Sequence, residues 1–214
     1  MSELEATVKA SDVFLISPVR IATPEDIKFM EGYVKEQESK GKIIYLPLRD
    51  TDQNDPVGLR ICRDNREAIR KTKEVQVYYK ENSQGTFFDL GMAWMNRKPI
   101  TFIGNGIKTL DDAFDSLGLD CSQLKGRKLT EWAERERFIL ENSRTLKRCY
   151  KTPFGRGYEW IDNNPNLAVF LFDFGMAFMA DAGIFLENNK QVERTPKKSF
   201  QNVLLELDAM YWDS

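Results

Sequence analysis

The sequence predicts an α/β protein with a Rossmann or flavodoxin-like parallel sheet sandwiched by helices. Short apolar runs typical of buried strands alternate with helical segments from residue 13 to residue 103. The helical segments carry start signals and apolar stripes of their own. Because each parallel strand pair needs a crossover connection, this alternation favours a parallel sheet with helices on its faces.

Each element can be placed from local residue patterns. Strands are expected at residues 13–16, 43–46, 75–79 and 100–103. The first helix should follow Thr23, because Pro24 and Asp26 supply a first-turn proline and a capping-box acid. A second helix should cover residues 59–69, and a third should run from Phe87 to about Asn96. The loops at residues 17–23, 49–56 and 80–86 should then share the carboxyl edge of the sheet, where such folds bind ligands.

The C-terminal part has a different character. We expect residues 1–118 to form the α/β domain and residues 119–214 to form a mainly helical extension packed on it, with helices over 130–150 and 199–212. Residues 172–179 nearly copy residues 88–95, and the similarity continues from 184–186 to 101–103. This similarity indicates a partial internal duplication.

Composition excludes several classes of function. The 214 residues include no histidine, so a Ser-His-Asp triad, a Cys-His pair and histidine-based zinc sites are impossible. A net charge of −2 argues against nucleic-acid binding, and no apolar stretch approaches the roughly 20 residues of a membrane span. Three scattered cysteines and a polar N-terminus indicate a reduced, cytoplasmic location. No metal or cofactor is expected.

The most informative segment follows the third strand. Ser83, Gly85 and Thr86 lie just before a helix, where hydroxyl groups, free backbone N–H groups and the helix dipole suit a phosphate. Asp89 follows about one turn into that helix. A simpler interpretation is that Ser83 caps the helix and Asp89 complements its dipole.

This segment, Ser83-Gln84-Gly85-Thr86-Phe87-Phe88-Asp89-Leu90-Gly91, resembles the S-x-G and F/Y-E-L/I-G motifs of the nucleoside 2-deoxyribosyltransferase family, which includes deoxynucleoside 5′-monophosphate N-glycosidases. The resemblance covers residues 12–105. It implies that Asp89 is the nucleophile that attacks the anomeric carbon of the sugar. The family usually has glutamate there, and aspartate is one methylene shorter.

Two further segments extend the resemblance. Ser17-Pro18-Val19-Arg20 is similar to the S-x-R element of the monophosphate glycosidases, which implies that Ser17, Arg20 and Ser83 hold a 5′-phosphate; alternatively, Arg20 is a solvated loop residue. The family often has a base-binding aspartate about eight residues before the third strand, and Arg66 falls there. Either Asp64 or Asn65 binds the base, or Arg66 meets a different ligand, or Arg66 lies on a solvated helix face.

These observations lead to an expected function. The chain should cleave or exchange the N-glycosidic bond of a (deoxy)nucleoside or its 5′-monophosphate, a small-molecule partner, and the family precedent implies a homodimer or larger homo-oligomer. The departures at Asp89 and Arg66 leave open a catalytically silent nucleotide-binding protein or a purely structural subunit. The copy at residues 172–175 lacks the polar cradle, so we expect it to serve as scaffold or to cover the site as a neighbouring subunit does in the family.

Overall fold

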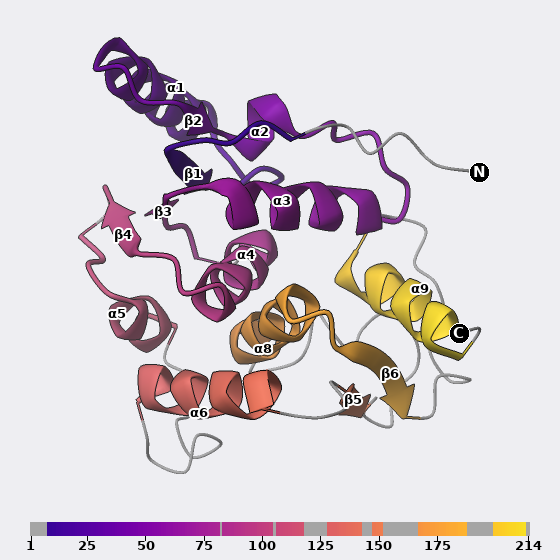
Figure 1. Ribbon diagram of the computed structural model, residues 1–214. Coiled ribbons are helices and arrows are strands. Elements are labelled where there is room, and N and C mark those ends of the chain that lie inside the picture. Colours follow the sequence, from indigo (N-terminus) through magenta and orange to yellow (C-terminus); the bar gives the residue numbers. More distant parts are fainter. Residues whose placement is uncertain are drawn as a thin grey trace.

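The computed structural model describes residues 8–81, 83–104, 106–117, 128–142, 147–151, 167–187 and 199–212 (Figure 1). The strands are β1 (Val13–Ile16), β2 (Ile44–Tyr45), β3 (Glu74–Tyr78), β4 (Ile100–Ile103), β5 (Lys147–Lys151) and β6 (Gly183–Glu187). The helices are α1 (Pro24–Ser39), α2 (Pro47–Asp50), α3 (Leu59–Lys71), α4 (Gln84–Met95), α5 (Leu110–Asp115), α6 (Leu129–Asn142), α8 (Leu167–Met179) and α9 (Phe200–Trp212).

Four strands form one parallel sheet in the order β2-β1-β3-β4. The expected α/β class with a parallel sheet flanked by helices is therefore confirmed. Ile16 of β1 pairs with Val77 of β3, so these strands end side by side. The chain leaves β1 toward β2 and leaves β3 toward β4. The carboxyl ends of β1 and β3 therefore meet where the strand order reverses, which is the usual ligand position in open α/β sheets.

Both faces of the sheet are buried. Val13 and Leu15 pack with Met30 and Val34 of α1 on one face. Phe14 and its neighbours on the other face join the core formed by α3 and α4. The expected capping box of α1 is present. The Thr23 backbone N–H donates to the Asp26 carboxylate, and the Asp26 backbone N–H donates to the Thr23 hydroxyl oxygen.

Two expected boundaries were wrong. α4 begins at Gln84, so residues 84–86 form its first turn instead of a preceding loop. The helix expected over 130–150 ends at Asn142, and residues 147–151 form β5, which pairs in parallel with β6. The described C-terminal residues thus contain a second small sheet. Local sequence favoured a continued helix, and the pairing with β6 overrides that preference.

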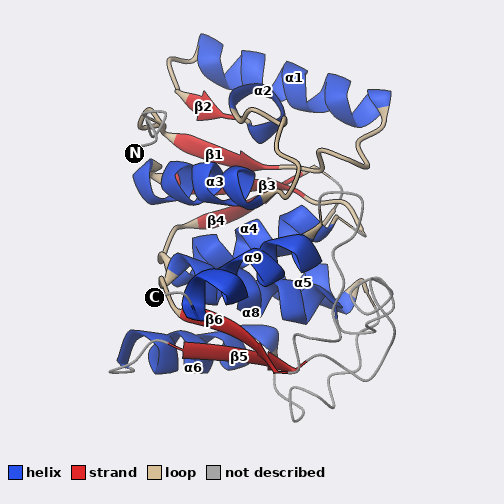
Figure 2. Ribbon diagram, turned by 90° about the vertical axis from the view of Figure 1, so that its right-hand side faces the viewer, coloured by secondary structure: helices blue, strands red, loops and turns tan. Residues whose placement is uncertain are grey.

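Helix α4 packs closely against α8 (Figure 1). A Cβ atom at Gly91 would lie 2.0 Å from the Phe172 carbonyl oxygen, and one at Gly175 would lie 2.0 Å from the Phe88 carbonyl oxygen. Only glycine permits this approach of the two backbones. Figure 2 shows α4, α5, α8 and α9 as a helical layer between the four-stranded sheet and the β5–β6 pair.

Candidate functional site

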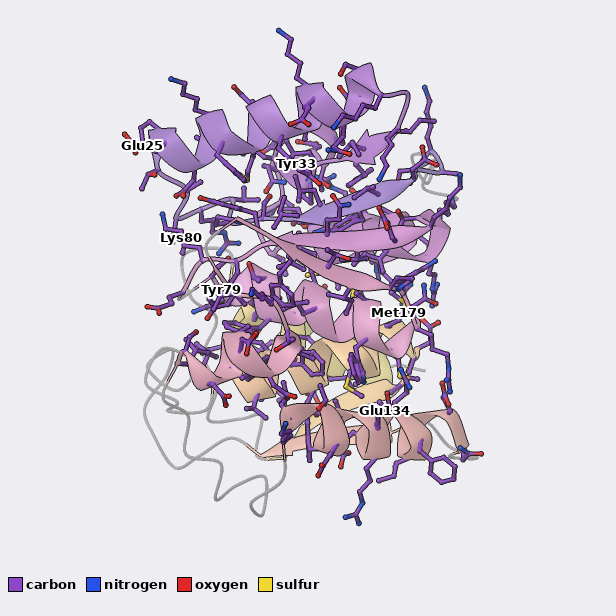
Figure 3. The ribbon with its side chains drawn as sticks, turned by 90° about the vertical axis from the view of Figure 1, so that its left-hand side faces the viewer. Glu25, Tyr33, Tyr79, Lys80, Glu134 and Met179 are labelled. Atoms are coloured by element: carbon purple, nitrogen blue, oxygen red, sulfur yellow. The ribbon has the colours of Figure 1, made fainter. Side chains whose placement is uncertain are left out.

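The candidate site lies at the carboxyl edge of the four-stranded sheet. Lys80, just after β3, forms an ion pair with Asp26 in the first turn of α1, and the Tyr78 hydroxyl donates to the same carboxylate at 2.8 Å. These contacts hold the pKa of Asp26 well below its usual range. Figure 3 shows Lys80 at the end of the sheet where α1 begins at Glu25. The loops after β1 and β3 are thereby fixed beside each other.

The first turn of α4 forms the polar cradle. Ser83 is the N-cap residue, but its side chain makes no capping hydrogen bond. Instead, the buried Thr86 hydroxyl donates to the Ser83 Oγ at 2.8 Å. Gly85 is exposed, and no atom lies within 4 Å of where its Cβ would stand. The simpler interpretation of Ser83 as a side-chain cap is therefore wrong, and the helix terminus is open at Gly85.

Ser17 adds an unsatisfied polar group at this edge. Its side chain is buried, with 7% of the residue exposed, and its hydroxyl has no hydrogen-bond partner within the described part of the chain. A buried hydroxyl without a protein partner costs about 1–3 kcal/mol unless a bound water or ligand completes it, so Ser17 is a candidate for ligand binding. Arg20, three residues further on, stays exposed, yet desolvation by the surrounding protein lowers its pKa.

Asp89 lies one turn into α4 and is 8% exposed. The Asn65 side-chain amide of α3 donates to it, with Nδ2 3.2 Å from Oδ2 and 3.5 Å from Oδ1. Burial raises the pKa of Asp89 to about 7, and the hydrogen bond from Asn65 partly opposes this shift. The carboxyl group therefore changes its charge near neutral pH, as is common at functional sites.

A chain of hydrogen bonds holds Asn65. The Thr51 hydroxyl donates to Asn65 Oδ1 at 2.9 Å, and the Tyr45 hydroxyl lies 2.8 Å from Thr51 Oγ1. Because Thr51 uses its only proton toward Asn65, Tyr45 donates to Thr51. The amide of Asn65 is thus oriented with its oxygen toward Thr51 and its NH₂ group toward Asp89. Thr51 and Tyr45 were not predicted from the sequence, although Thr51 belongs to a loop expected at this edge.

Several other titratable groups lie near Asp89. The Cys62 side chain of α3 is buried. Burial is the main cause that raises the pKa of this thiol, and the charges of Asp89 and Asp55 add to the shift. The charge of Arg20 acts in the opposite direction. Burial also raises the pKa of Tyr45, with Asp64, Asp50 and Asp89 adding to the shift and its bond to Thr51 opposing it. The charges of Asp89 and Arg20 thus act on the same thiol, in opposite directions.

The three neighbours in α3 that were considered for base binding point to different partners. Asn65 reaches Asp89, whereas Asp64 accepts a hydrogen bond from Arg60 at 3.2 Å, and burial raises the pKa of Asp64. Arg66 donates to the carbonyl oxygen of Phe178 and to Asp181, both beyond the site. Its guanidinium therefore binds this end of α8, and only 19% of the side chain is exposed, so it does not lie on a solvated face.

Comparison with known proteins gives no further guide, since no family model, curated protein or solved structure matches the chain.

The described residues contain no group of three or more aspartate, glutamate or cysteine side chains arranged to hold a metal ion. None of the helices in the described ranges is both long enough and apolar enough to span a membrane.

Proposed function

We propose that this protein cleaves or exchanges the N-glycosidic bond of a (deoxy)nucleoside or nucleoside 5′-monophosphate in the cytoplasm, on a Rossmann-like sheet. The supporting observation is the position of Asp89. This buried carboxyl group is held by an amide one turn inside a helix whose open N-terminus faces the edge that also carries Ser17. A phosphate at that terminus would receive N–H groups, the Ser17 and Ser83 hydroxyls and the charge of Arg20.

The proposed reaction has two steps. In the first, one oxygen of ionised Asp89 attacks C1′ of the sugar, the bond from C1′ to the base nitrogen breaks, and the base takes the electron pair. The departing base takes up a proton from solvent. In the second step, water or another base attacks C1′, displaces Asp89 and loses a proton.

The burial of Asp89 affects this chemistry. An exposed aspartate would be almost fully ionised at pH 7, but a pKa of about 7 leaves roughly half of the molecules in the reactive form. Activity should therefore rise between about pH 6 and pH 8.

The test is incubation with a panel of nucleosides and nucleotides, with free base followed by chromatography. We expect release by the native protein, at least a hundredfold less by Asp89→Ala, and native rates for Asp173→Ala, which changes the matching aspartate of α8. Equal release by the native protein and Asp89→Ala would exclude Asp89 as the nucleophile.

A second candidate is a catalytically silent nucleotide-binding protein. The same burial of Asp89 favours it, because a half-protonated, short carboxylate is a weaker nucleophile. Thermal unfolding with the same nucleotide panel distinguishes the two functions. Ligand-dependent stabilisation without any release of base would support the silent protein, whereas sustained product formation would exclude it.

A further inference from the structure

Two runs of elements follow the same order along the chain. The first unit, α3-β3-α4-β4-α5, spans Leu59–Asp115, and the second unit, α6-β5-α8-β6-α9, spans Leu129–Trp212. In each unit the two strands pair in parallel. The described part of the second unit has no counterparts of β1, α1 and β2, since α5 ends at Asp115 and α6 begins at Leu129.

The contacts between the units are reciprocal. A Cβ atom at Gly91 would lie as close to the Phe172 carbonyl oxygen as one at Gly175 would lie to the Phe88 carbonyl oxygen. The Phe88 ring packs 5.5 Å from the ring of Phe178, and its counterpart Phe172 packs 6.4 Å from the ring of Trp94, the counterpart of Phe178. The contacts between α4 and α8 are thus reciprocal, as across a two-fold axis.

The polar contacts follow the same rule. Arg66 of α3 lies over the Phe178 ring, 4.8 Å from its centroid, and donates to the Phe178 carbonyl oxygen at 3.2 Å. Arg137 of α6 lies 5.4 Å from the Trp94 ring and donates to the Trp94 carbonyl oxygen at 3.1 Å. Trp94 and Phe178 are the last aromatic residues of α4 and α8. Two arginines in matching positions therefore bind the carboxyl ends of matching helices.

One pair of contacts is reciprocal in position and reversed in charge. Arg97 and Asp181 follow α4 and α8, and both have a left-handed backbone, with φ of 53° and 54°. Arg70 of α3 pairs with Asp181 at 2.6 Å, and Glu141 of α6 pairs with Arg97 at 2.8 Å. The first unit thus has arginine at both positions, Arg70 and Arg97. The second unit has an acidic residue at both, Glu141 and Asp181.

We infer that the face formed by α3, α4 and α5 is a self-association surface, and that the second unit of the same chain occupies it as a built-in partner. In place of the homodimer that the family resemblance implies, the chain is a monomer that resembles a dimer. Among the described residues, only the first sheet has a complete carboxyl edge, because the described part of the second unit has no counterpart of the β1 loop with Ser17 and Arg20. The described part of the chain therefore holds one candidate site.

The charges determine which partner fits. If the first units of two chains paired, Arg70 of each would meet Arg97 of the other, and these like charges would repel. Each exposed pair has a small effect, so the reciprocal apolar contacts hold the units together and the charges select between partners.

The first test is the mass in solution. Light scattering should give the mass of one chain, 24.8 kDa, for the native protein at micromolar concentrations. Gly175→Val should separate α8 from α4 and free the Gly91 face for a second copy, giving a dimer. The control variant carries both Gly91→Val and Gly175→Val, which blocks both pairings and should stay monomeric. A native dimer, or a Gly175→Val protein that remains a folded monomer, would overturn the inference.

The second test uses charge reversal, and its first part does not depend on opening the units. Arg97→Glu alone and Glu141→Arg alone should each lower the urea midpoint of unfolding, and the double variant should restore it. In the Gly175→Val background, Arg97→Glu should tighten dimerisation roughly fivefold, because the carboxylate introduced into one chain then faces Arg70 of the other. Additive single effects, or weaker dimerisation, would contradict the selective role of the charges.

Discussion

At the scale of single residues, the orientation of one amide opposes the effect of burial on the charge of Asp89. Asn65 can present either its NH₂ group or its oxygen to a neighbour, and only the NH₂ group stabilises an ionised carboxylate. Thr51 fixes the orientation of the Asn65 amide by donating to its oxygen, which leaves the NH₂ group toward Asp89. The Thr51 hydroxyl, which acts only through Asn65, thereby favours the ionised form of Asp89 and opposes the effect of burial.

Thr51→Val removes that donor. The oxygen of Asn65 loses its partner, so the amide can turn its oxygen toward protonated Asp89, and we expect the pKa of Asp89 to rise above about 7. Titration of the Asp89 carboxyl carbon by NMR measures this directly, without any activity. Thr51→Ser keeps the hydroxyl and should leave the pKa unchanged. An equal pKa in the native protein and Thr51→Val would show that Thr51 does not orient Asn65.

Asp89 should also destabilise the protein at neutral pH. Its folded-state pKa of about 7 lies above the unfolded value of about 3.9, so the folded state binds more protons between these values. The free energy of unfolding therefore falls as pH rises from about 4 to about 7, by up to about 4 kcal/mol. Asp89→Asn should lack this loss and exceed the native stability at pH 8. Urea unfolding at pH 4, 6 and 8 measures the difference; parallel pH profiles would contradict the prediction.

At the scale of elements, α4 combines two roles on one helix. Its first turn carries the polar cradle, and its middle packs on α8 through Gly91. The four strands of the larger sheet were predictable to within about one residue, because each is a short run rich in apolar residues between polar breaks. The start of α4 was missed because Gly85 and Thr86 are poor helix formers, and β5 was missed because its only described pairing partner, β6, lies far along the chain.

Gly91→Ala tests the close packing of α4 on α8. The added Cβ meets a backbone carbonyl that cannot move alone, so we expect a loss of about 3 kcal/mol or more in the free energy of unfolding. Gly32→Ala in α1 is the matched control: nothing lies within 4 Å of its Cβ, and it should stabilise the protein by about 0.5–1 kcal/mol. Urea unfolding compares them. Equal effects of the two substitutions would show that α4 and α8 do not approach as closely as described.

At the scale of the whole molecule, the parallel arrangement of the strands was the predictable part of the candidate site. It brings the residues after β1 and β3 to one edge, and the motif resemblance selected Ser17, Ser83 and Asp89 there. The choice among Asp64, Asn65 and Arg66 could not be made, because it depends on the rotation of α3 about its axis. That rotation is fixed partly by the contacts of Arg66 and Arg70 with the second unit, far away in sequence.

The same contacts predict how the molecule unfolds. The aromatic cluster joins Phe88 of α4 to Phe174 and Phe178 of α8 and to Phe200 of α9, so neither sheet keeps its core when the other opens. We expect one cooperative unit despite two sheets. Hydrogen exchange in dilute denaturant should give amides of β3 and of α8 the same free energy of opening. If α8 opened at a clearly lower free energy while β3 stayed protected, the second unit would be an appendage instead of half of one core.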